Sequence, residues 1–151
     1  MKKDNSIIIG SGVIGSYLAK FLLSKKQRII VTSRKRKKSY TNYNKLDIEN
    51  KVIFEELDVL KKNEILKLLK KYTPKNIFYF SGQSSLTKSI KLKKVTNDSN
   101  YIGAKKILEI LHKYELKTNF YKANSGYIFE PNKGLVNIKS KISKNKNPYI
   151  Q

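Results

Sequence analysis

The sequence contains no cysteine and no tryptophan, and it has a single histidine, His112. Without cysteine the chain has neither a disulfide framework nor a thiolate metal site, and it suits a reducing cytoplasm. One histidine is too few for a multi-histidine metal cluster, so we expect no metal. A chain of 151 residues with 39% hydrophobic content can bury one core, which predicts a single domain.

Acidic residues are also scarce: the chain has 11 acidic and 33 basic residues, which gives a net charge of +22. Such a charge is typical of proteins that bind nucleic acid or an anionic surface. However, 30 of the 33 are lysine, whereas recognition of base edges and phosphates favours arginine. The lysines are spread along the whole chain, and isoleucine and asparagine are abundant too, which indicates AT-rich coding. Binding to nucleic acid therefore remains only an alternative.

The stretch 6–23 near the N-terminus carries one charged residue, Lys20, and could imitate a membrane segment. Asp4, Lys20 and three glycines interrupt it, and no small-residue cleavage site follows. We therefore expect a soluble, cytoplasmic protein with no membrane partner.

Short β-forming runs alternate with helical periodicity along the chain, which predicts βαβ units and a parallel sheet. The expected strands are 6–9, 28–32, 52–56, 76–80 and 118–123. The first is a continuous apolar run, as in strands buried on both faces. The predicted fold class is α/β, a doubly wound parallel sheet of five strands in the order 3-2-1-4-5. This order leaves a crevice at the carboxyl ends of the first and fourth strands, where such folds bind ligands.

Four helices are expected with these strands, and periodicity defines three of them. The first carries Ile14, Tyr17, Leu18 and Phe21 on one face. The second carries Ile65, Leu68, Leu69 and Tyr72 and is stopped by Pro74. The third runs from about Asn97 to Tyr114, with Ala104, Ile107, Leu108 and Leu111 facing the sheet. The lysine-rich segment 35–50 and the polar segment 131–147 are expected to be loops.

A G-x-G-x-x-G motif lies between the first strand and the first helix and consists of Gly10, Gly12 and Gly15, with Val13 and Ile14 between them. Gly10 permits a tight turn, Gly12 lets a diphosphate approach the backbone, and Gly15 allows close contact between helix and strand. The helix N-terminus adds N–H groups and a positive dipole. The alternative is an incidental glycine-rich turn.

The end of the second strand shows which dinucleotide is expected. An NAD enzyme places Asp or Glu there, but this chain has Ser33, Arg34 and Arg36. Hydroxyl and guanidinium groups suit a 2′-phosphate, which favours NADP; the alternative is ordinary basic surface. Further on, Asp58, next to Val59, could accept a hydrogen bond from adenine, or it could cap a helix.

Four segments at matching intervals resemble GDP-mannose 4,6-dehydratase, of the extended short-chain dehydrogenase/reductase superfamily. They are 15–23 (GSYLAKFLL), 80–85 (FSGQSS), 100–103 (NYIG) and 120–123 (FYKA). The resemblance covers the whole chain but only the N-terminal half of a typical member. It implies a Rossmann-type fold, truncated before the substrate-binding region.

The resemblance also implies a reaction: NADP takes a hydride from C4 of GDP-mannose, water leaves across C5–C6, and the hydride returns to C6. By position, Ser125 would orient the sugar and Tyr149 would be the catalytic base. The cofactor would be lined by Ser81, Gly82 and Gln83, and Asn100 would support the long helix or the active site. A homo-oligomer, or pairing with a full-length subunit, is a further expectation.

The chain departs from the family at several positions. The family's lysine, four residues after the tyrosine, would fall beyond Gln151, and Tyr127 replaces the usual glutamate base. Ile9 stands where the family has its first glycine. We therefore expect an NADP-binding domain at 1–130, and at 131–151 a loop with the start of the tyrosine helix, with little activity alone. A non-catalytic dinucleotide-binding paralogue and another nucleotide-sugar epimerase or reductase remain alternatives.

Overall fold

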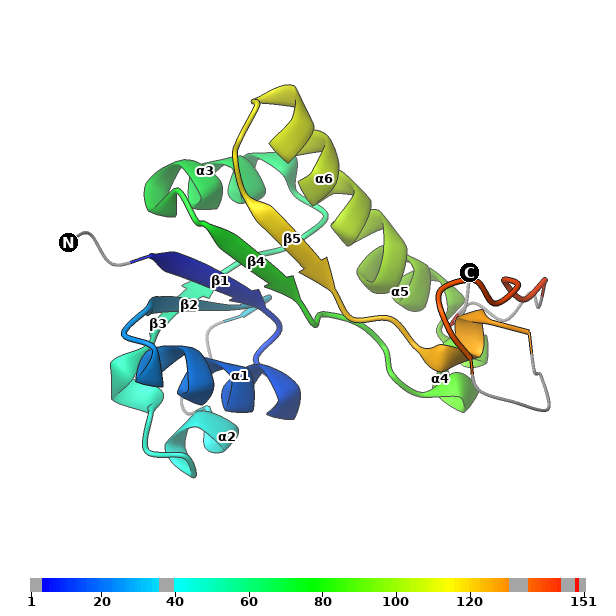
Figure 1. Cartoon of the computed structure of the whole chain (residues 1–151), viewed down its shortest axis with the longest axis horizontal. Helices are drawn as coiled ribbons and strands as arrows, with labels where there is room; N and C mark the ends of the chain where they lie inside the picture. Colours follow the sequence, from blue (N-terminus) through cyan, green and yellow to red (C-terminus); the bar gives the residue numbers. More distant parts are fainter. Residues whose placement is uncertain (1–3, 36–39, 131–135, 145–148, 150–151) are drawn as a thin grey trace.

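The computed structural model describes residues 4–35, 40–130, 136–144 and 149, and its centre is a five-stranded parallel sheet (Figure 1). The strand order is β3-β2-β1-β4-β5, so the predicted order is confirmed. The strands are β1 (Asn5–Ile9), β2 (Arg28–Ser33), β3 (Ile53–Glu56), β4 (Asn76–Tyr79) and β5 (Asn119–Lys122). Each predicted strand is present to within one or two residues.

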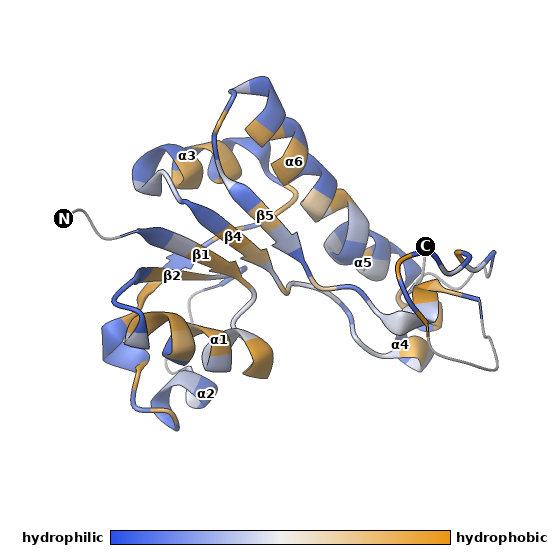
Figure 2. Ribbon diagram, viewed as in Figure 1, coloured by the Kyte–Doolittle hydropathy of each residue, from blue (hydrophilic) through white to orange (hydrophobic). Residues whose placement is uncertain are grey.

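The two sides of the sheet form separate hydrophobic clusters, because successive side chains of a strand point to opposite faces. Ile7 and Ile9 of β1 pack into one cluster, whereas Ile8 packs into the other. Figure 2 shows β1 and β4 beginning in blue and turning to the orange of hydrophobic residues along the strand. A strand covered on both faces is expected to carry a continuous apolar run, as β1 does at Ile7, Ile8 and Ile9.

Helices cover both faces of the sheet. Residues of α3 (Lys62–Tyr72) and α6 (Gly103–Lys113) contribute to the cluster around Ile7, and those of α1 (Val13–Ser24) and α2 (Thr41–Asn44) to the cluster around Ile8. Helix α3 ends at Tyr72, where Thr73 has a φ of 39° and Pro74 follows, so proline ends this helix as predicted. Among the residues described, no helix is long and apolar enough to cross a membrane.

The long helical segment before β5 begins earlier than predicted. It comprises α4 (Leu86–Lys91), α5 (Lys93–Asn97), a π-helical turn at Asp98–Ile102, and α6. Ala104, Ile107 and Leu111 are buried as predicted, but Leu108 is exposed and Ile110 is buried in its place. The prediction for Leu108 is therefore wrong: the packed stripe runs through positions 103, 104, 107, 110 and 111.

The predicted loop at 35–50 is also partly wrong, because α2 and a 3-10 turn at Glu49–Lys51 lie within it. Tyr40, Tyr43 and Ile48 are buried and belong to the core on the α1 side of the sheet. Aromatic side chains thus anchor a segment whose lysines and asparagines suggested an exposed loop.

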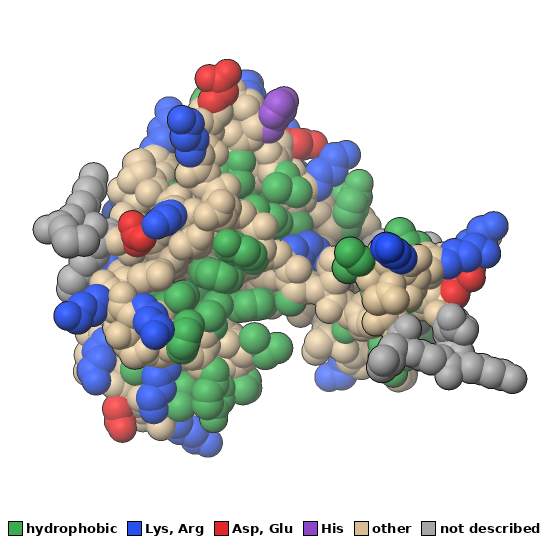
Figure 3. Space-filling model, in the orientation of Figure 1, with side chains coloured by type: hydrophobic (Ala, Val, Ile, Leu, Met, Phe, Trp, Pro, Cys, Tyr) green, Lys and Arg blue, Asp and Glu red, His purple; other side chains and the backbone are tan. Residues whose placement is uncertain are grey.

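Most of the predicted apolar stripe of α1 faces away from the sheet, and only Leu18 packs against the core. Ile14, Tyr17 and Phe21 are 67%, 62% and 56% exposed, whereas the buried residues of α1 are Gly15, Ser16, Ala19 and Leu22. Small side chains at Gly15, Ser16 and Ala19 let α1 lie close to the strands, and Ile14, Tyr17 and Phe21 lie on the outer side. In Figure 3 hydrophobic side chains form a green patch over α1 and over the sheet above it.

Candidate functional site

The glycine turn joins β1 to α1 at the carboxyl edge of the sheet. Gly10 has a φ of +113°, a conformation that favours glycine. Its N–H donates to the Thr32 carbonyl at 3.2 Å, which ties the turn to the end of β2. Gly12 is the N-cap of α1, and a Cβ added there would meet no atom within 4 Å. The turn therefore presents open space in front of the first N–H groups of a twelve-residue helix.

Gly15 lies at the contact between α1 and β1. A Cβ at this position would be 2.6 Å from the Gly10 carbonyl oxygen and 3.1 Å from Cγ2 of Ile8. Cβ atoms in proteins do not approach backbone oxygen so closely, so only glycine fits here without a shift of the backbone.

A cavity of about 1020 Å³ opens where β1, β2 and β3 end. Six of the predicted residues line it: Gly10, Ser33, Arg34, Asp58, Val59 and Ser81. Gly12, Val13 and Gly15 are not part of its wall, and Arg36 lies outside the described residues. The end of β2 and the end of β1 thus contribute to one cavity, as the strand order requires.

The wall of this cavity carries charges of both signs. Lys35, Lys61, Lys67 and Lys71 add to Arg34, and the carboxylates are Glu55, Glu56, Asp58 and Glu64. Two of the carboxylates are paired locally: Glu64 with Lys61 at 2.8 Å, and Glu55 with Lys71 at 2.5 Å. The sequence did not lead us to predict Glu55 and Glu56 as residues of the site, although the strand order 3-2-1 places the end of β3 beside Ser33.

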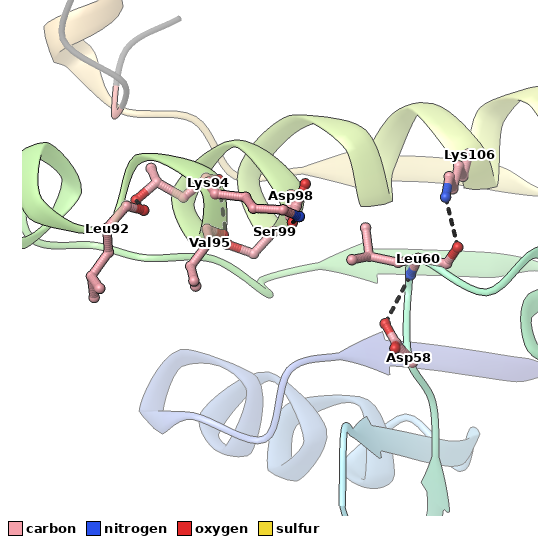
Figure 4. Close-up of polar contacts among 9 residues, drawn as sticks. Asp58, Leu60, Leu92, Lys94, Val95, Asp98, Ser99 and Lys106 are labelled. Carbon is pink, nitrogen blue, oxygen red and sulfur yellow. Dashed lines mark hydrogen bonds and ion pairs between the residues drawn. The ribbon is translucent and has the colours of Figure 1, made fainter.

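Asp58 follows β3 and lines both this cavity and a neighbouring one of about 260 Å³. Figure 4 shows its carboxylate accepting a hydrogen bond from the Leu60 N–H at 3.0 Å, while the Lys106 ammonium donates to the Leu60 carbonyl. Helix α3 begins at Lys62 with Lys61 as its N-cap, so the alternative that Asp58 caps this helix is wrong. Asp58 instead orders the turn that leads to the helix.

Asn100 holds the loop after β4 in place. Its Oδ1 accepts from the Gln83 N–H at 2.8 Å, and its Nδ2 donates to the Gln83 carbonyl at 3.1 Å. A Cβ on Gly82 would be 2.7 Å from the same Oδ1. Asn100 lies in the π-helical turn, a local irregularity that is often found at functional sites. The two hydrogen bonds fix the Gly82–Gln83 backbone against the long helix.

A third cavity, of about 270 Å³, brings the two predicted catalytic residues together. Its wall includes Ser125 and Tyr149, and also Gly82, Gln83, Asn100 and Ile14. Ser125 begins the 3-10 turn Gly126–Ile128, and its hydroxyl accepts a hydrogen bond from the Tyr127 N–H at 3.2 Å. Tyr127 itself is 63% exposed and is not part of the wall.

Lys122 also lines this third cavity, although it was not predicted to be a site residue. It is the last residue of β5, and its ammonium donates to Oδ1 of Asn124. Partial burial lowers the pKa of Lys122. An amine therefore lies at the same end of the cleft as Ser125 and Tyr149.

The parallel sheet, the glycine turn and the cavities at its carboxyl edge define a doubly wound α/β domain of the Rossmann type. A family model described as GDP-mannose 4,6 dehydratase matches residues 7–149. The chain therefore belongs to the GDP-mannose 4,6-dehydratase family.

Several known proteins share this similarity. GDP-mannose 4,6-dehydratase of Yersinia enterocolitica is 29% identical over 140 residues, which cover 85% of this chain and 37% of that protein. CDP-paratose 2-epimerase of Salmonella typhi is 29% identical over 121 residues, 80% of this chain and 36% of that protein. The solved UDP-Glc/GlcNAc 4-epimerase of Campylobacter jejuni matches with a TM-score of 0.83 at 18% identity, over 97% of this chain and 45% of that one. The chain spans about a third of the length of these curated relatives.

Proposed function

We propose that this chain binds NADP in the cleft at the carboxyl edge of its sheet, as part of a nucleotide-sugar 4,6-dehydratase. The observation that carries this proposal is the meeting of the glycine turn, Arg34 and Asp58 around one large cavity. A diphosphate would lie on the first N–H groups of α1, where Gly12 leaves open space. Asp58 and Val59 would hold the adenine, and Ser33 and Arg34 the phosphate on its ribose.

The preference for NADP over NAD rests on the charges at the end of β2. Arg34 and Lys35 line the cavity directly after Ser33, and no carboxylate follows this strand. Glu55, on the adjacent strand, is already engaged by Lys71 and Tyr72. A guanidinium can make charge-assisted hydrogen bonds to a 2′-phosphate, which NAD lacks.

Fluorescence titration with NADPH and with NADH tests this assignment. We expect the wild-type chain to bind NADPH more tightly, and Arg34→Ala to weaken NADPH about tenfold or more while NADH changes little, given the strength of charged hydrogen bonds. Lys117→Ala is the matched control, because Lys117 is exposed before β5 at the opposite edge of the sheet. Equal affinity for the two dinucleotides in the wild-type chain would refute the preference.

The third cavity supports a role at the sugar. When bound, the nicotinamide would accept a hydride and later return it. Ser125 would hold the sugar hydroxyl, and Tyr149 would take its proton, as general bases do within hydrogen-bond reach. Ser81, Gly82 and Gln83 would line the cofactor between the two ends of the cleft, with Ile14 beside them and Asn100 fixing their backbone.

The 151-residue chain by itself should dehydrate GDP-mannose slowly or not at all. Tyr127 stands two residues after Ser125, where the family places its glutamate base, and a phenol does not replace a carboxylate as the base that removes the C5 proton. An assay of GDP-mannose turnover tests this expectation, and robust formation of the 4-keto-6-deoxy sugar would contradict it.

A second candidate is a dinucleotide-binding module without dehydratase activity, and the outward-facing Tyr127 favours it. Saturable NADPH binding without any sugar product would support this function. An epimerised sugar as the product would instead support an epimerase, in line with the similarity to CDP-paratose 2-epimerase.

A further inference from the structure

Tyr43 lies beneath the glycine turn and is fully buried. Its hydroxyl is the buried side-chain atom for which the described part of the chain provides no hydrogen-bond partner. Burial, and to a smaller extent Tyr40, raises the pKa of Tyr43, so the hydroxyl stays protonated and is a donor at neutral pH. Buried hydroxyl groups are nearly always hydrogen-bonded, so this exception calls for a reason.

The position of this hydroxyl is set by rigid neighbours. The Tyr43 ring packs edge-to-face against Tyr40 and Phe54, with centroid distances of 6.3 and 5.2 Å. Tyr40 and Phe54 stack on each other at 3.6 Å. The Tyr43 backbone is held as well, because its N–H donates to the Tyr40 carbonyl at 2.8 Å. The hydroxyl therefore has little freedom to seek a partner elsewhere.

The Tyr43 hydroxyl and the Gly10 carbonyl both lie close to Gly15. A Cβ placed on Gly15 would be 3.3 Å from the Tyr43 hydroxyl oxygen and 2.6 Å from the Gly10 carbonyl oxygen. A donor and an acceptor therefore both border the space that the missing side chain of Gly15 leaves open. The Gly10 N–H is already bonded to Thr32, so the opposite side of the turn is fixed.

We propose that Tyr43 is a positioning residue of the glycine turn, and that its hydroxyl donates to the Gly10 carbonyl, directly or through one water, when a diphosphate occupies the cleft. The proposal rests on the dinucleotide binding proposed above. A diphosphate that draws the N–H groups of the turn toward itself would tilt the one peptide plane between Gly10 and Ser11, which carries the Gly10 carbonyl, while β2 and α1 hold the rest of the turn. Tyr43 gains its partner in that state alone, which makes the ligand-bound turn the favoured one.

The cluster of Tyr40, Tyr43 and Phe54 also extends to Ser33, where the 2′-phosphate of NADP is proposed to bind. The Tyr40 hydroxyl lies 3.1 Å from Oγ of Ser33, which in turn donates to the Lys35 carbonyl at 2.8 Å. Tyr40 therefore has a partner in the ligand-free protein, whereas Tyr43 does not. This difference provides a matched pair of hydroxyl deletions, Tyr43→Phe and Tyr40→Phe, in the same cluster.

The experiment combines thermal unfolding without ligand with titrations of NADPH, ADP and 2′-AMP. We expect Tyr43→Phe to raise the Tm, because it removes a buried hydroxyl without a partner, and to weaken NADPH and ADP about five- to tenfold, the value of one ordinary hydrogen bond. Binding of 2′-AMP should not change, because this ligand has no diphosphate. Tyr40→Phe should lower the Tm instead.

The possible results separate this inference from the proposed function. If the wild-type chain binds neither NADPH nor ADP, the dinucleotide proposal fails and the role of Tyr43 fails with it. If the wild type binds and Tyr43→Phe binds NADPH equally well, the role of Tyr43 alone is refuted. A lowered Tm in Tyr43→Phe, or an equal loss of 2′-AMP binding, would also refute it, because either result indicates a merely structural hydroxyl.

Discussion

The two ends of the cleft are supported in different ways. The glycine turn stands on β1 and β2, whose residues Ile8, Ile30 and Val31 have no exposed surface, and it is tied to β2 through Gly10 and Thr32. The end that holds Ser125 and Tyr149 follows β5, the edge strand of the sheet, where Tyr121 is half exposed. A backbone held by buried strands is suited to bind a phosphate group by its N–H groups, whereas residues on outer turns adapt more easily.

The comparison indicates how the proposed functions divide. Affinity for the dinucleotide should depend on the end with the glycine turn (the rigid end), because that end would hold the diphosphate and the adenosine. The chemistry should depend on the end with the third cavity (the exposed end), where Lys122 lies with the catalytic candidates Ser125 and Tyr149. Asn100 holds the Gln83 backbone, in the loop after β4 that lines the third cavity.

The largest effect should come from Gly15→Ala. The added methyl group would be 2.6 Å from the Gly10 carbonyl oxygen and 3.1 Å from Ile8, so α1 or the turn must move. We expect a loss of about 3 kcal/mol in the free energy of unfolding, the upper range for overpacking, and no measurable NADPH binding. Urea unfolding and fluorescence titration measure the two effects.

Gly12→Ala is the matched control for that variant. A methyl group there meets nothing within 4 Å and Gly12 has a φ of −80°, so stability should change by less than about 0.5 kcal/mol. The methyl nevertheless occupies the space in front of the helix N-terminus, so NADPH binding should weaken about tenfold or more. Normal binding by Gly12→Ala would show that the diphosphate does not lie at this turn.

The next largest effect is a loss of stability in alkaline solution through Tyr79. Its hydroxyl is buried and donates to the Ser99 carbonyl at 2.6 Å, and burial raises its pKa to about 12. Because the folded state favours the protonated form, this stabilisation is complete below pH 10 and is lost as the pH rises from 10 to 12. The loss should reach about 2–3 kcal/mol by pH 12.

Lysine side chains titrate in the same range, so the effect of Tyr79 has to be read as a difference. Unfolding of Tyr79→Phe should depend less steeply on pH above 10 than unfolding of the wild type, although the variant is less stable at pH 8 for lack of the bond to Ser99. Parallel curves for the two proteins would show that Tyr79 does not ionise on unfolding.

A smaller effect is expected at Asn100, which holds the loop after β4. Asn100→Ala removes both hydrogen bonds to Gln83 and should cost about 1–2 kcal/mol. Asn100→Asp keeps the acceptor for the Gln83 N–H but turns a carboxylate oxygen toward the Gln83 carbonyl, so it should cost at least as much. Urea unfolding measures both losses, and a wild-type stability of Asn100→Ala would show that the two bonds contribute nothing.

The architecture could be read from the sequence because its signals are local. Buried strands appear as apolar runs, and a glycine turn after the first run fixes where the cleft lies. The packing side of α1 could not be read in this way. Periodicity reveals a stripe of Ile14, Tyr17 and Phe21, but close approach to the sheet selected the side with Gly15, Ser16 and Ala19.

The parts of the site that were missed depend on contacts distant in sequence. Glu55 and Glu56 line the first cavity because β3 pairs with β2, and Lys122 reaches the third because β5 pairs with β4. The burial of Tyr40 and Tyr43 was not predicted, because the segment around them is rich in lysine and asparagine. Their spacing of three residues was the one local sign that this segment turns its aromatic side chains into the core.

The smallest effect should come from the exposed end. If the dinucleotide is held by the rigid end, Ser125→Ala and Tyr149→Phe should each change NADPH affinity by less than about twofold, because neither hydroxyl would contact the diphosphate or the adenosine. Arg34→Ala, measured in the same titration, is the positive control. A loss of tenfold or more in Ser125→Ala would contradict this division and would mean that the third cavity contributes as much to holding the dinucleotide as the glycine turn does.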